Sequence, residues 1–340
     1  MGKLPLGKLD PDFLARLLNQ YTRTDERILV GASIGEDATV IDFGATCLVA
    51  KTDPITFATD EIGWYAVHVN ANDIAVSGGV PRWFLSTILL PEAQTDESMV
   101  ENIFRQLSEA CAQLGISLCG GHTEVTYGLD RPLVIGQMLG EVTKENLVRS
   151  SGGRPGDDLL LSKGIAIEAT AIIAREKEAE LSARHSEGFL ARCRNMLHEP
   201  GISVLREARL AVEALPHHEI HAMHDPTEGG LATGVWELAT ASKTGVWLDG
   251  DALPILPETQ VLCAAYSLDP LGVIASGSLL VALNPAYSSQ VLSLWRAEGI
   301  DGAMIGKLTE ASEGMTLSQY GQTRELPRFR RDEIARLFET

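Results

Sequence analysis

The sequence predicts a two-domain fold of mixed α and β structure, and three observations support this. The chain has 340 residues, whereas a single domain usually has roughly 100–200. Short β-branched runs alternate with segments of helical periodicity along the chain. The most turn-rich stretch, residues 150–157, predicts a boundary between an N-terminal domain at 1–150 and a C-terminal domain at 151–340.

The first domain is predicted to combine short strands with helices. β-Branched runs separated by glycine indicate the strands, and apolar residues at helical spacing indicate the helices. We expect helices at 10–21, 64–77 and 96–114, the last with Thr95 as N-cap, and strands at 27–31, 38–43, 46–52, 84–90, 116–119 and 133–142. In the second helix, Asn70, Asp73 and Ser77 fall on one face.

The second domain is predicted to have the same mixed character. We expect strands at 158–162, directly before Asp225, at 273–283 and at 301–307, the last closing the domain, with helices at 165–175, 203–214, 231–242 and 288–298. Residues 176–194 are rich in charge and indicate a solvated helix face. The two domains together predict one α/β protein.

The net charge of -18 bears on the class of partner. It would repel phosphate backbones, and no basic stripe with interleaved aromatic residues offsets it, so nucleic acid is not an expected partner. An acidic protein can still bind a nucleotide when Mg²⁺ neutralises carboxylates and phosphates together. The composition therefore favours a metal–nucleotide site.

The cysteines and the N-terminal residues indicate in which cellular compartment the protein is expected. Five cysteines are dispersed without a C-x-x-C pair, which argues against a zinc knot or a disulfide framework. Residues 1–5 lack the apolar run of a signal peptide, and no stretch approaches the roughly 18 apolar residues of a membrane span. We therefore expect a soluble, cytoplasmic protein that does not act at a membrane.

The familiar nucleotide-binding motifs, such as G-x-x-x-x-G-K-[ST] and G-x-G-x-x-G, are absent from the sequence. Acidic residues instead occur at turns or strand ends, within residues 35–38, 51–54, 70–73 and 224–226. Each alone could be an N-cap or an Asx-turn. Carboxylates at such positions can also converge on a hard cation.

Four stretches carry a resemblance to a known superfamily. They are Ile34-Gly-Glu-Asp-Ala38, Asn70-Ala-Asn-Asp-Ile-Ala-Val-Ser-Gly-Gly79, Gly120-Gly-His-Thr-Glu124 and His224-Asp-Pro-Thr-Glu-Gly-Gly-Leu-Ala232. In this order they resemble aminoimidazole ribonucleotide synthetase (PurM), selenophosphate synthetase, thiamine-monophosphate kinase and HypE, and the last stretch is most similar to HypE. The resemblance covers nearly the whole chain. It implies the two-domain PurM-like fold, a homodimer formed by pairing strands of the first domain, and active sites near the dimer interface.

The resemblance also implies site residues. Magnesium ions that bridge the triphosphate of ATP would be held by Asp37, Asp53 and Asp73. Catalytic roles would fall to His122 and to Asp225, the latter in the second domain. The nucleotide would contact Lys51, Asn70, Gly120, Gly121, Thr123, Thr227, Gly229 and Gly230.

Glycines at two of these places suit an anion. A turn at Gly120-Gly121 would let backbone N–H groups approach phosphate, and a helix beginning at Gly229-Gly230 would offer free N–H groups and its dipole. The alternatives are a tight turn after a strand at the first pair and glycine packing at the second. For His122 the alternative is an ordinary surface histidine.

The sequence departs from the HypE pattern at two places. HypE proper ends in a cysteine, whereas this chain ends Arg336-Leu-Phe-Glu-Thr340, and neither Glu339 nor Thr340 can replace a thiolate. Glu228 stands where HypE usually has a basic residue, which would weaken a phosphate contact. The acceptor in the reaction is therefore left open.

We expect an ATP-dependent enzyme that activates an amide-like or phosphate oxygen on a small or carrier-bound substrate, in hydrogenase or metallocofactor maturation. Two alternatives remain open. One is a non-catalytic, dimeric nucleotide-binding or regulatory member of the superfamily. The other is a phosphotransferase similar to thiamine-monophosphate kinase.

Histidines and one cysteine suggest further chemistry. His217, His218, His221 and His224 could bind a transition metal if they shared a helix, but a strand leading into Asp225 would separate them. Cys119 ends an apolar run, and we interpret it as a core residue rather than a nucleophile.

Overall fold

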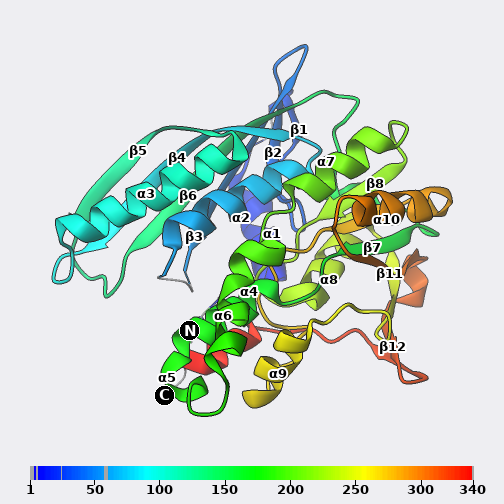
Figure 1. Ribbon diagram of the computed structural model, residues 1–340. Helices are drawn as coiled ribbons and strands as arrows, with labels where there is room; N and C mark the ends of the chain where they lie inside the picture. The colour runs from blue at the N-terminus through cyan, green and yellow to red at the C-terminus, as the bar shows by residue number, and fades with distance from the viewer. Residues whose placement is uncertain (1–3, 5–6, 24, 57–59, 339–340) are drawn as a thin grey trace. The chain divides into compact units, whose positions relative to one another are not determined.

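The computed structural model describes residues 4, 7–23, 25–56 and 60–338. The chain divides into two compact units. The N-terminal unit consists of residues 25–31 and 37–147, and the C-terminal unit consists of residues 1–24, 32–36 and 148–340. Each contains one β-sheet with helices (Figure 1). The predicted two-domain mixed α/β fold is confirmed. Residues 1–3, 5, 339 and 340, on which the expectations about the two termini partly rest, lie outside the described residues.

The N-terminal unit is a six-stranded sheet with two helices. The strands are β1 (Ile28–Val30), β2 (Thr39–Asp42), β3 (Cys47–Ile55), β4 (Val80–Pro91), β5 (Ser117–Thr126) and β6 (Leu133–Val142), in the order β1-β2-β3-β6-β4-β5. The helices are α2 (Ile62–Val76) and α3 (Glu97–Leu114). Only the β4–β5 pair is parallel. Helix α2 contacts β3, β6 and β4. It is buried along almost its whole length, because its own residues are mostly apolar on nearly every face.

Three expectations for this unit are wrong in detail. Strand β3 extends to Ile55, so that Asp53 lies within the strand and not in a turn after it. The N-cap of α3 is Asp96 rather than Thr95, because the Asp96 carboxylate accepts a hydrogen bond from the Met99 backbone N–H at 2.8 Å. Residues 117–126 form one continuous strand, which removes the predicted turn at 120–121.

The C-terminal unit contains a seven-stranded sheet. Its strands are β7 (Asp158–Ser162), β8 (Ile220–His224), β9 (Gly245–Asp249), β10 (Leu280–Leu283), β11 (Gly302–Thr309), β12 (Met315–Gln319) and β13 (Gln322–Glu325), in the order β13-β12-β9-β11-β7-β10-β8. Its α-helices are α1 (Pro11–Tyr21), α4 (Ile167–Glu176), α5 (Glu178–Leu181), α6 (Glu187–Asn195), α7 (Leu205–Ala214), α8 (Gly230–Ser242), α9 (Pro257–Ala265) and α10 (Ser288–Ala297). Short helical turns lie at η1 (Ser150–Gly152), η2 (Leu197–Gly201), η3 (Pro285–Tyr287), η4 (Ala311–Glu313) and η5 (Glu333–Phe338).

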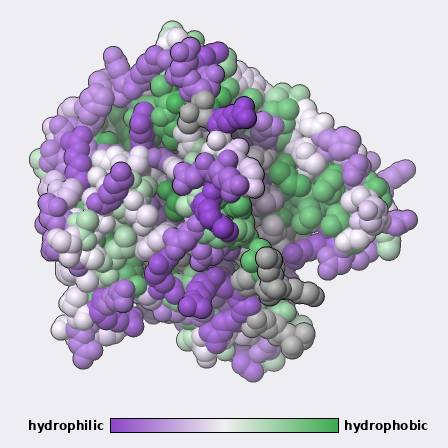
Figure 2. All heavy atoms as spheres, turned by 180° about the vertical axis from the view of Figure 1, so that it is seen from behind, coloured by the Kyte–Doolittle hydropathy of each residue, from purple (hydrophilic) through white to green (hydrophobic). Residues whose placement is uncertain are grey.

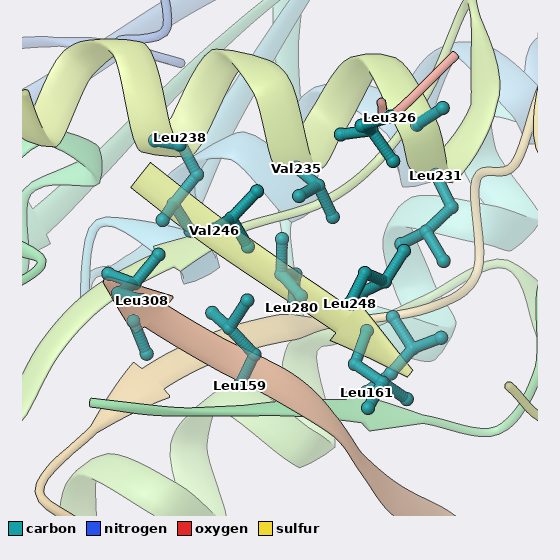
Figure 3. Close-up of a cluster of buried hydrophobic side chains, with 14 of the residues drawn as sticks. Leu159, Leu161, Leu231, Val235, Leu238, Val246, Leu248, Leu280, Leu308 and Leu326 are labelled. Carbon is teal, nitrogen blue, oxygen red and sulfur yellow. The ribbon is translucent and has the colours of Figure 1, made fainter. Parts of the chain in front are cut away.

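The core of this unit lies between the sheet and helix α8. Alternate residues of the central strands, such as Leu159 and Leu161, point to the same face and meet Leu231, Val235 and Leu238 of the helix (Figure 3). This packing fixes where α8 begins, and with it the position of the loop between β8 and α8.

Two expectations for the second domain are wrong. The predicted strand over 273–283 is reduced to Leu280–Leu283, and residues 271–279 form an irregular segment whose backbone groups bind the start of α8 and Asp332. The strand predicted to close the domain, β11, is followed by β12 and β13.

The outer surface is mixed in character. Hydrophilic side chains are spread over the face of the molecule seen in Figure 2, with apolar areas between them. Cys119, expected in the core, is exposed on β5, and its thiol donates to the Phe84 carbonyl. Among the helices in the described part of the chain, none has both the length and the apolar character to cross a bilayer.

Candidate functional site

Two carboxylates and one ammonium group meet where β3 lies beneath α2. Lys51 and Asp53 are two residues apart on β3 and therefore point to the same face of the sheet. The Lys51 Nζ lies 3.3 Å from Asp53 Oδ2 and 3.0 Å from Asp73 Oδ1 of α2. The structure thus brings together two of the predicted metal ligands and the predicted nucleotide contact Lys51.

These three side chains differ in exposure. Asp73 is 5% exposed and Lys51 is 19% exposed, whereas Asp53 is 36% exposed. Burial alone would lower the pKa of Lys51, but attraction to Asp73, Asp53 and also Asp37 raises it well above its usual value. Lys51 is therefore a fully charged cation held by carboxylates.

Asn70 acts as a clamp on the backbone of β3 and is fully buried. Its Oδ1 accepts a hydrogen bond from the Asp53 N–H at 2.8 Å, and its Nδ2 donates to the carbonyl oxygens of Asp53 at 3.2 Å and Ala66 at 2.8 Å. The Asn70 amide is therefore committed to the backbone, where it positions Asp53. A contact between Asn70 and the nucleotide stays a prediction.

Gly136 of β6 is the partner residue that makes this clamp possible. It pairs with Asp53 across the β3–β6 ladder. A Cβ atom at Gly136 would lie 2.3 Å from Asn70 Nδ2 and 2.8 Å from the Phe84 ring. Only glycine leaves room for the Asn70 amide above the sheet. No local pattern indicates this role, since Gly136 lies in an ordinary apolar run.

The residues around His122 occupy a different place. Gly120, Gly121, His122 and Thr123 lie on β5, the edge strand, three strand positions from β3 in the sheet order. At roughly 4.8 Å per strand this separation is about 14 Å. The structure therefore does not bring His122 or Thr123 to the Lys51, Asp53 and Asp73 group of the same unit.

Strand pairing explains one of the two glycines on β5. A Cβ at Gly121 would lie 1.9 Å from the Ser86 carbonyl oxygen on β4, so this position needs glycine for the close approach of the two strands. Gly120 has ordinary space around it. His122 Nε2 lies 3.2 Å from Glu124 Oε2, and both side chains are largely exposed.

In the C-terminal unit, Asp225 follows β8 and is buried. Its neighbour His224 is also buried, and its Nε2 lies 3.2 Å from Glu237 Oε2 on α8. Lys8 Nζ lies 3.4 Å from Glu237 Oε1. Burial alone would raise the pKa of Glu237, but the Lys8 ammonium and the His224 hydrogen bond lower it to about 2. Glu237 and Lys8, which the sequence analysis did not single out, therefore orient the residue before Asp225.

The two glycines expected to offer free N–H groups to an anion at the start of α8, Gly229 and Gly230, donate these groups within the chain. The Gly229 N–H donates to Asp332 Oδ2 at 2.7 Å, and the Gly230 N–H donates to the Thr227 carbonyl at 3.0 Å. Both glycines are buried. A Cβ at Gly230 would lie 2.5 Å from the Leu271 carbonyl oxygen. These glycines serve close backbone packing.

Asp332 is a further acidic residue that the sequence motifs did not indicate. It is 2% exposed, and its Oδ1 accepts hydrogen bonds from Ile274 and Ile334 while Oδ2 accepts from Gly229. Burial raises the pKa of Asp332 to about 6 even though these N–H groups bind its ionised form. Only its contact with Ile334 is local in sequence, so the others could not be foreseen.

Glu228, which stands where HypE usually has a basic residue, binds the N-terminal segment. Its Oε1 accepts a hydrogen bond from the Lys8 N–H at 3.0 Å. Lys8 therefore contacts the loop after β8 through Glu228 and helix α8 through Glu237.

The histidine run does not form a metal centre. His221 and His224 lie three residues apart on strand β8, so their side chains point to opposite faces. His221 Nδ1 is paired with Asp157 Oδ1 at 2.8 Å, while His224 is paired with Glu237. Among the described residues, no group of three or more potential ligands contains two of these histidines.

The fold and the site together indicate a class of protein. In the N-terminal unit, acidic side chains lie between the mixed sheet and helix α2, and a second α/β unit follows in the sequence. Residues 35–142 match the N-terminal domain of AIR synthase related proteins, and residues 154–317 match the C-terminal domain. The chain belongs to the AIR synthase related family. This confirms the resemblance that the four sequence stretches carried.

Relatives within the family include HypE and selenide, water dikinase. The chain is 28% identical over 281 residues to the carbamoyl dehydratase HypE of Rhizobium leguminosarum bv. viciae, covering 80% of this chain and 76% of that protein. It is 31% identical over 284 residues to the selenide, water dikinase of Nitratidesulfovibrio vulgaris (strain DSM 19637 / Miyazaki F), covering 80% and 73%. The crystal structure of hydrogenase maturation protein HypE in complex with ATP matches with a TM-score of 0.72 at 22% identity, covering 94% of this chain and 91% of that one.

Proposed function

We propose that this chain is a HypE-like protein that binds ATP through Mg²⁺ and acts in hydrogenase or metallocofactor maturation. The observation that carries the proposal is the convergence of Asp53 and Asp73 on one cationic group, the Lys51 ammonium. Magnesium is usually held by one or two carboxylates together with phosphate oxygens, and this donor set fits it. The family relationship to a carbamoyl dehydratase and to a dikinase supports a nucleotide-dependent reaction.

In the proposed site Asp37, Asp53 and Asp73 hold the metal, which when bound neutralises the charge of the phosphate oxygens. Lys51 binds a phosphate oxygen as a point charge. Asn70 holds Asp53 in place through the β3 backbone, so that little motion is needed when the ligand arrives. The protein's contribution is then positioning and charge neutralisation. The substrate step we propose is activation of an amide-like or phosphate oxygen on a small or carrier-bound molecule.

We also propose a homodimer, with nucleotide contacts from β5. The edge strand β5 is exposed along most of its length, including His122 and Thr123. An exposed edge strand is a template for pairing with another chain. In a dimer, Gly120, Gly121, His122 and Thr123 of one copy would serve a site that a single copy leaves incomplete. Within the C-terminal unit we propose a catalytic role for Asp225 and a nucleotide contact for Thr227.

Calorimetric titration with a non-hydrolysable ATP analogue in the presence and absence of Mg²⁺ tests the proposal. Asp53→Asn and Asp73→Asn each remove one ligand charge, which should weaken Mg²⁺-dependent binding by 2–5 kcal/mol, at least about thirtyfold. Asp42→Asn is the matched control, because Asp42 is an acidic residue of the neighbouring strand β2 paired with Lys144. Equal affinity in all four proteins would exclude the proposed site.

The non-catalytic alternative has one observation in its favour. The N–H groups of Gly229 and Gly230 are occupied within the chain, and Glu228 carries a negative charge near them. These features weaken the phosphate contacts that the resemblance implied for this loop. Single-turnover assays with ATP and carbamoylated or phosphorylated candidate substrates separate the two functions, since a non-catalytic member would bind the nucleotide and release it unchanged.

A further inference from the structure

We infer that the Lys51 ammonium is a resident counter-ion that must leave the Asp53–Asp73 pair when a divalent cation binds there. This inference rests on the proposed function and adds a control on the order of binding. The ammonium lies 3.3 Å from Asp53 Oδ2 and 3.0 Å from Asp73 Oδ1, so it occupies the position at which the two carboxylates converge. The same two oxygen atoms are the ones that a metal ion would take.

The charges around Lys51 explain why it stays there without a metal. Asp37, Asp53 and Asp73 all attract Lys51. Three carboxylates and one ammonium leave a net charge of about -2 in a partly buried region, and without the ammonium the charge would be about -3. Lys51 thus reduces the cost of holding the carboxylates close together in the absence of ligand.

Lys51 is also the part of this group that can move. The Asp53 backbone is held at both its N–H and its carbonyl by Asn70, and Asp73 lies in the interior of the buried helix α2. Lysine instead has a flexible four-carbon stem that ends in a compact charge. A divalent cation and an ammonium that share two carboxylates repel each other strongly, so the exchange displaces Lys51 rather than the carboxylates.

The displaced ammonium needs a new anion, and a nucleotide phosphate supplies it. A divalent cation alone must separate Lys51 from Asp53 and Asp73, and the lost attraction opposes binding of the cation. A cation that arrives with a polyphosphate provides that partner. The structure therefore assigns Lys51 the role of coupling cation binding to nucleotide binding.

The test measures Mn²⁺ binding without nucleotide, by electron paramagnetic resonance of the free ion. Wild type should bind Mn²⁺ weakly. Lys51→Gln removes the competing charge and should raise the Mn²⁺ affinity about tenfold or more. Lys51→Arg retains the charge and should remain weak. Lys144→Gln removes a lysine that is paired with Asp42 in the same unit, and should behave as wild type.

A second measurement gives the opposite sign for the nucleotide. With saturating Mg²⁺, Lys51→Gln should bind a non-hydrolysable ATP analogue about tenfold more weakly, because the phosphate loses its ammonium contact. Lys51→Met, which fills similar space without a polar head, should repeat both results if Lys51→Gln does not fold.

The two proposals fail in different ways. Unchanged or weaker Mn²⁺ binding by folded Lys51→Gln and Lys51→Met would overturn the exchange, since Lys51 would then assist the cation rather than compete with it. A wild-type protein that binds no Mg²⁺–nucleotide at all would overturn the proposed function instead. In that case a tenfold gain of Mn²⁺ affinity in Lys51→Gln would still show that the ammonium guards the carboxylate pair.

Discussion

Replacing Asn70 by alanine tests whether the clamp on β3 builds the site. The change removes three hydrogen bonds, two to the Asp53 backbone and one to the Ala66 carbonyl. A net value of about 0.5–1.5 kcal/mol for each gives a loss of about 1.5–4.5 kcal/mol, with the lower part favoured because Asp53 is partly exposed. The Asp53 carboxylate would also lose its fixed position, and Mg²⁺-dependent nucleotide affinity should fall about tenfold or more.

Two measurements and one control make the test specific. Hydrogen exchange by mass spectrometry should show lost protection in peptides that cover β3, and calorimetry should show the weaker binding. Gln106→Ala removes a comparable contact in the same unit, since Gln106 Oε1 accepts from the Gly63 N–H at the start of α2. It should lower stability by about 1 kcal/mol without a change in nucleotide affinity. Wild-type β3 protection and affinity in Asn70→Ala would refute the clamp.

Three further predictions follow from buried groups. Burial raises the pKa of Glu168 to about 7, although the Ser276 N–H, which binds the ionised carboxylate, opposes this rise. The contribution of Glu168 to the free energy of unfolding is therefore fully present below about pH 4.5 and falls by up to about 3 kcal/mol as pH rises through 7. Denaturant titrations of Glu168→Gln at several pH values should lack this decrease. Glu207→Ala removes the carboxylate that lies 2.8 Å from the buried Lys163 ammonium, and should lower the free energy of unfolding by about 3–5 kcal/mol. The double variant Lys163→Met with Glu207→Leu should lower it by less, as measured in a double-mutant cycle. Gly136→Ala should lower the melting temperature and nucleotide affinity together, because its Cβ would overlap the Asn70 amide.

The sequence predicted the architecture well because most of it is carried by local patterns. Strands β2, β6 and β7 and helices α3, α8 and α10 lie within a few residues of their expected ranges. Apolar periodicity and turn residues are enough to locate such elements. The segment at 271–279 was misjudged because its apolar residues are buried by long-range contacts with the start of α8, which no local pattern encodes.

The candidate site divides in the same way. Motif spacing pointed to Asp53 and Asp73, and the structure brings them together on Lys51. Motif spacing could not reveal that the Asn70 amide binds the backbone of β3, because the sequence does not show whether an amide on a helix face points to a ligand or to a strand. The turn expected at Gly120-Gly121 was misjudged because glycine suits an anion turn and the close approach of two strands, which Gly121 requires, equally well.

The contact between Asp332 and Gly229 has a consequence for dividing the chain into fragments. The family match to the C-terminal domain ends at residue 317, yet the carboxylate that receives the N–H group at the start of α8 comes from residue 332. A fragment cut at 317 would leave the N–H groups of Gly229 and Ile274 without this acceptor in a buried place. The segment that contains η5 is therefore part of the minimal folding unit, and expression trials of the isolated C-terminal domain should extend through it.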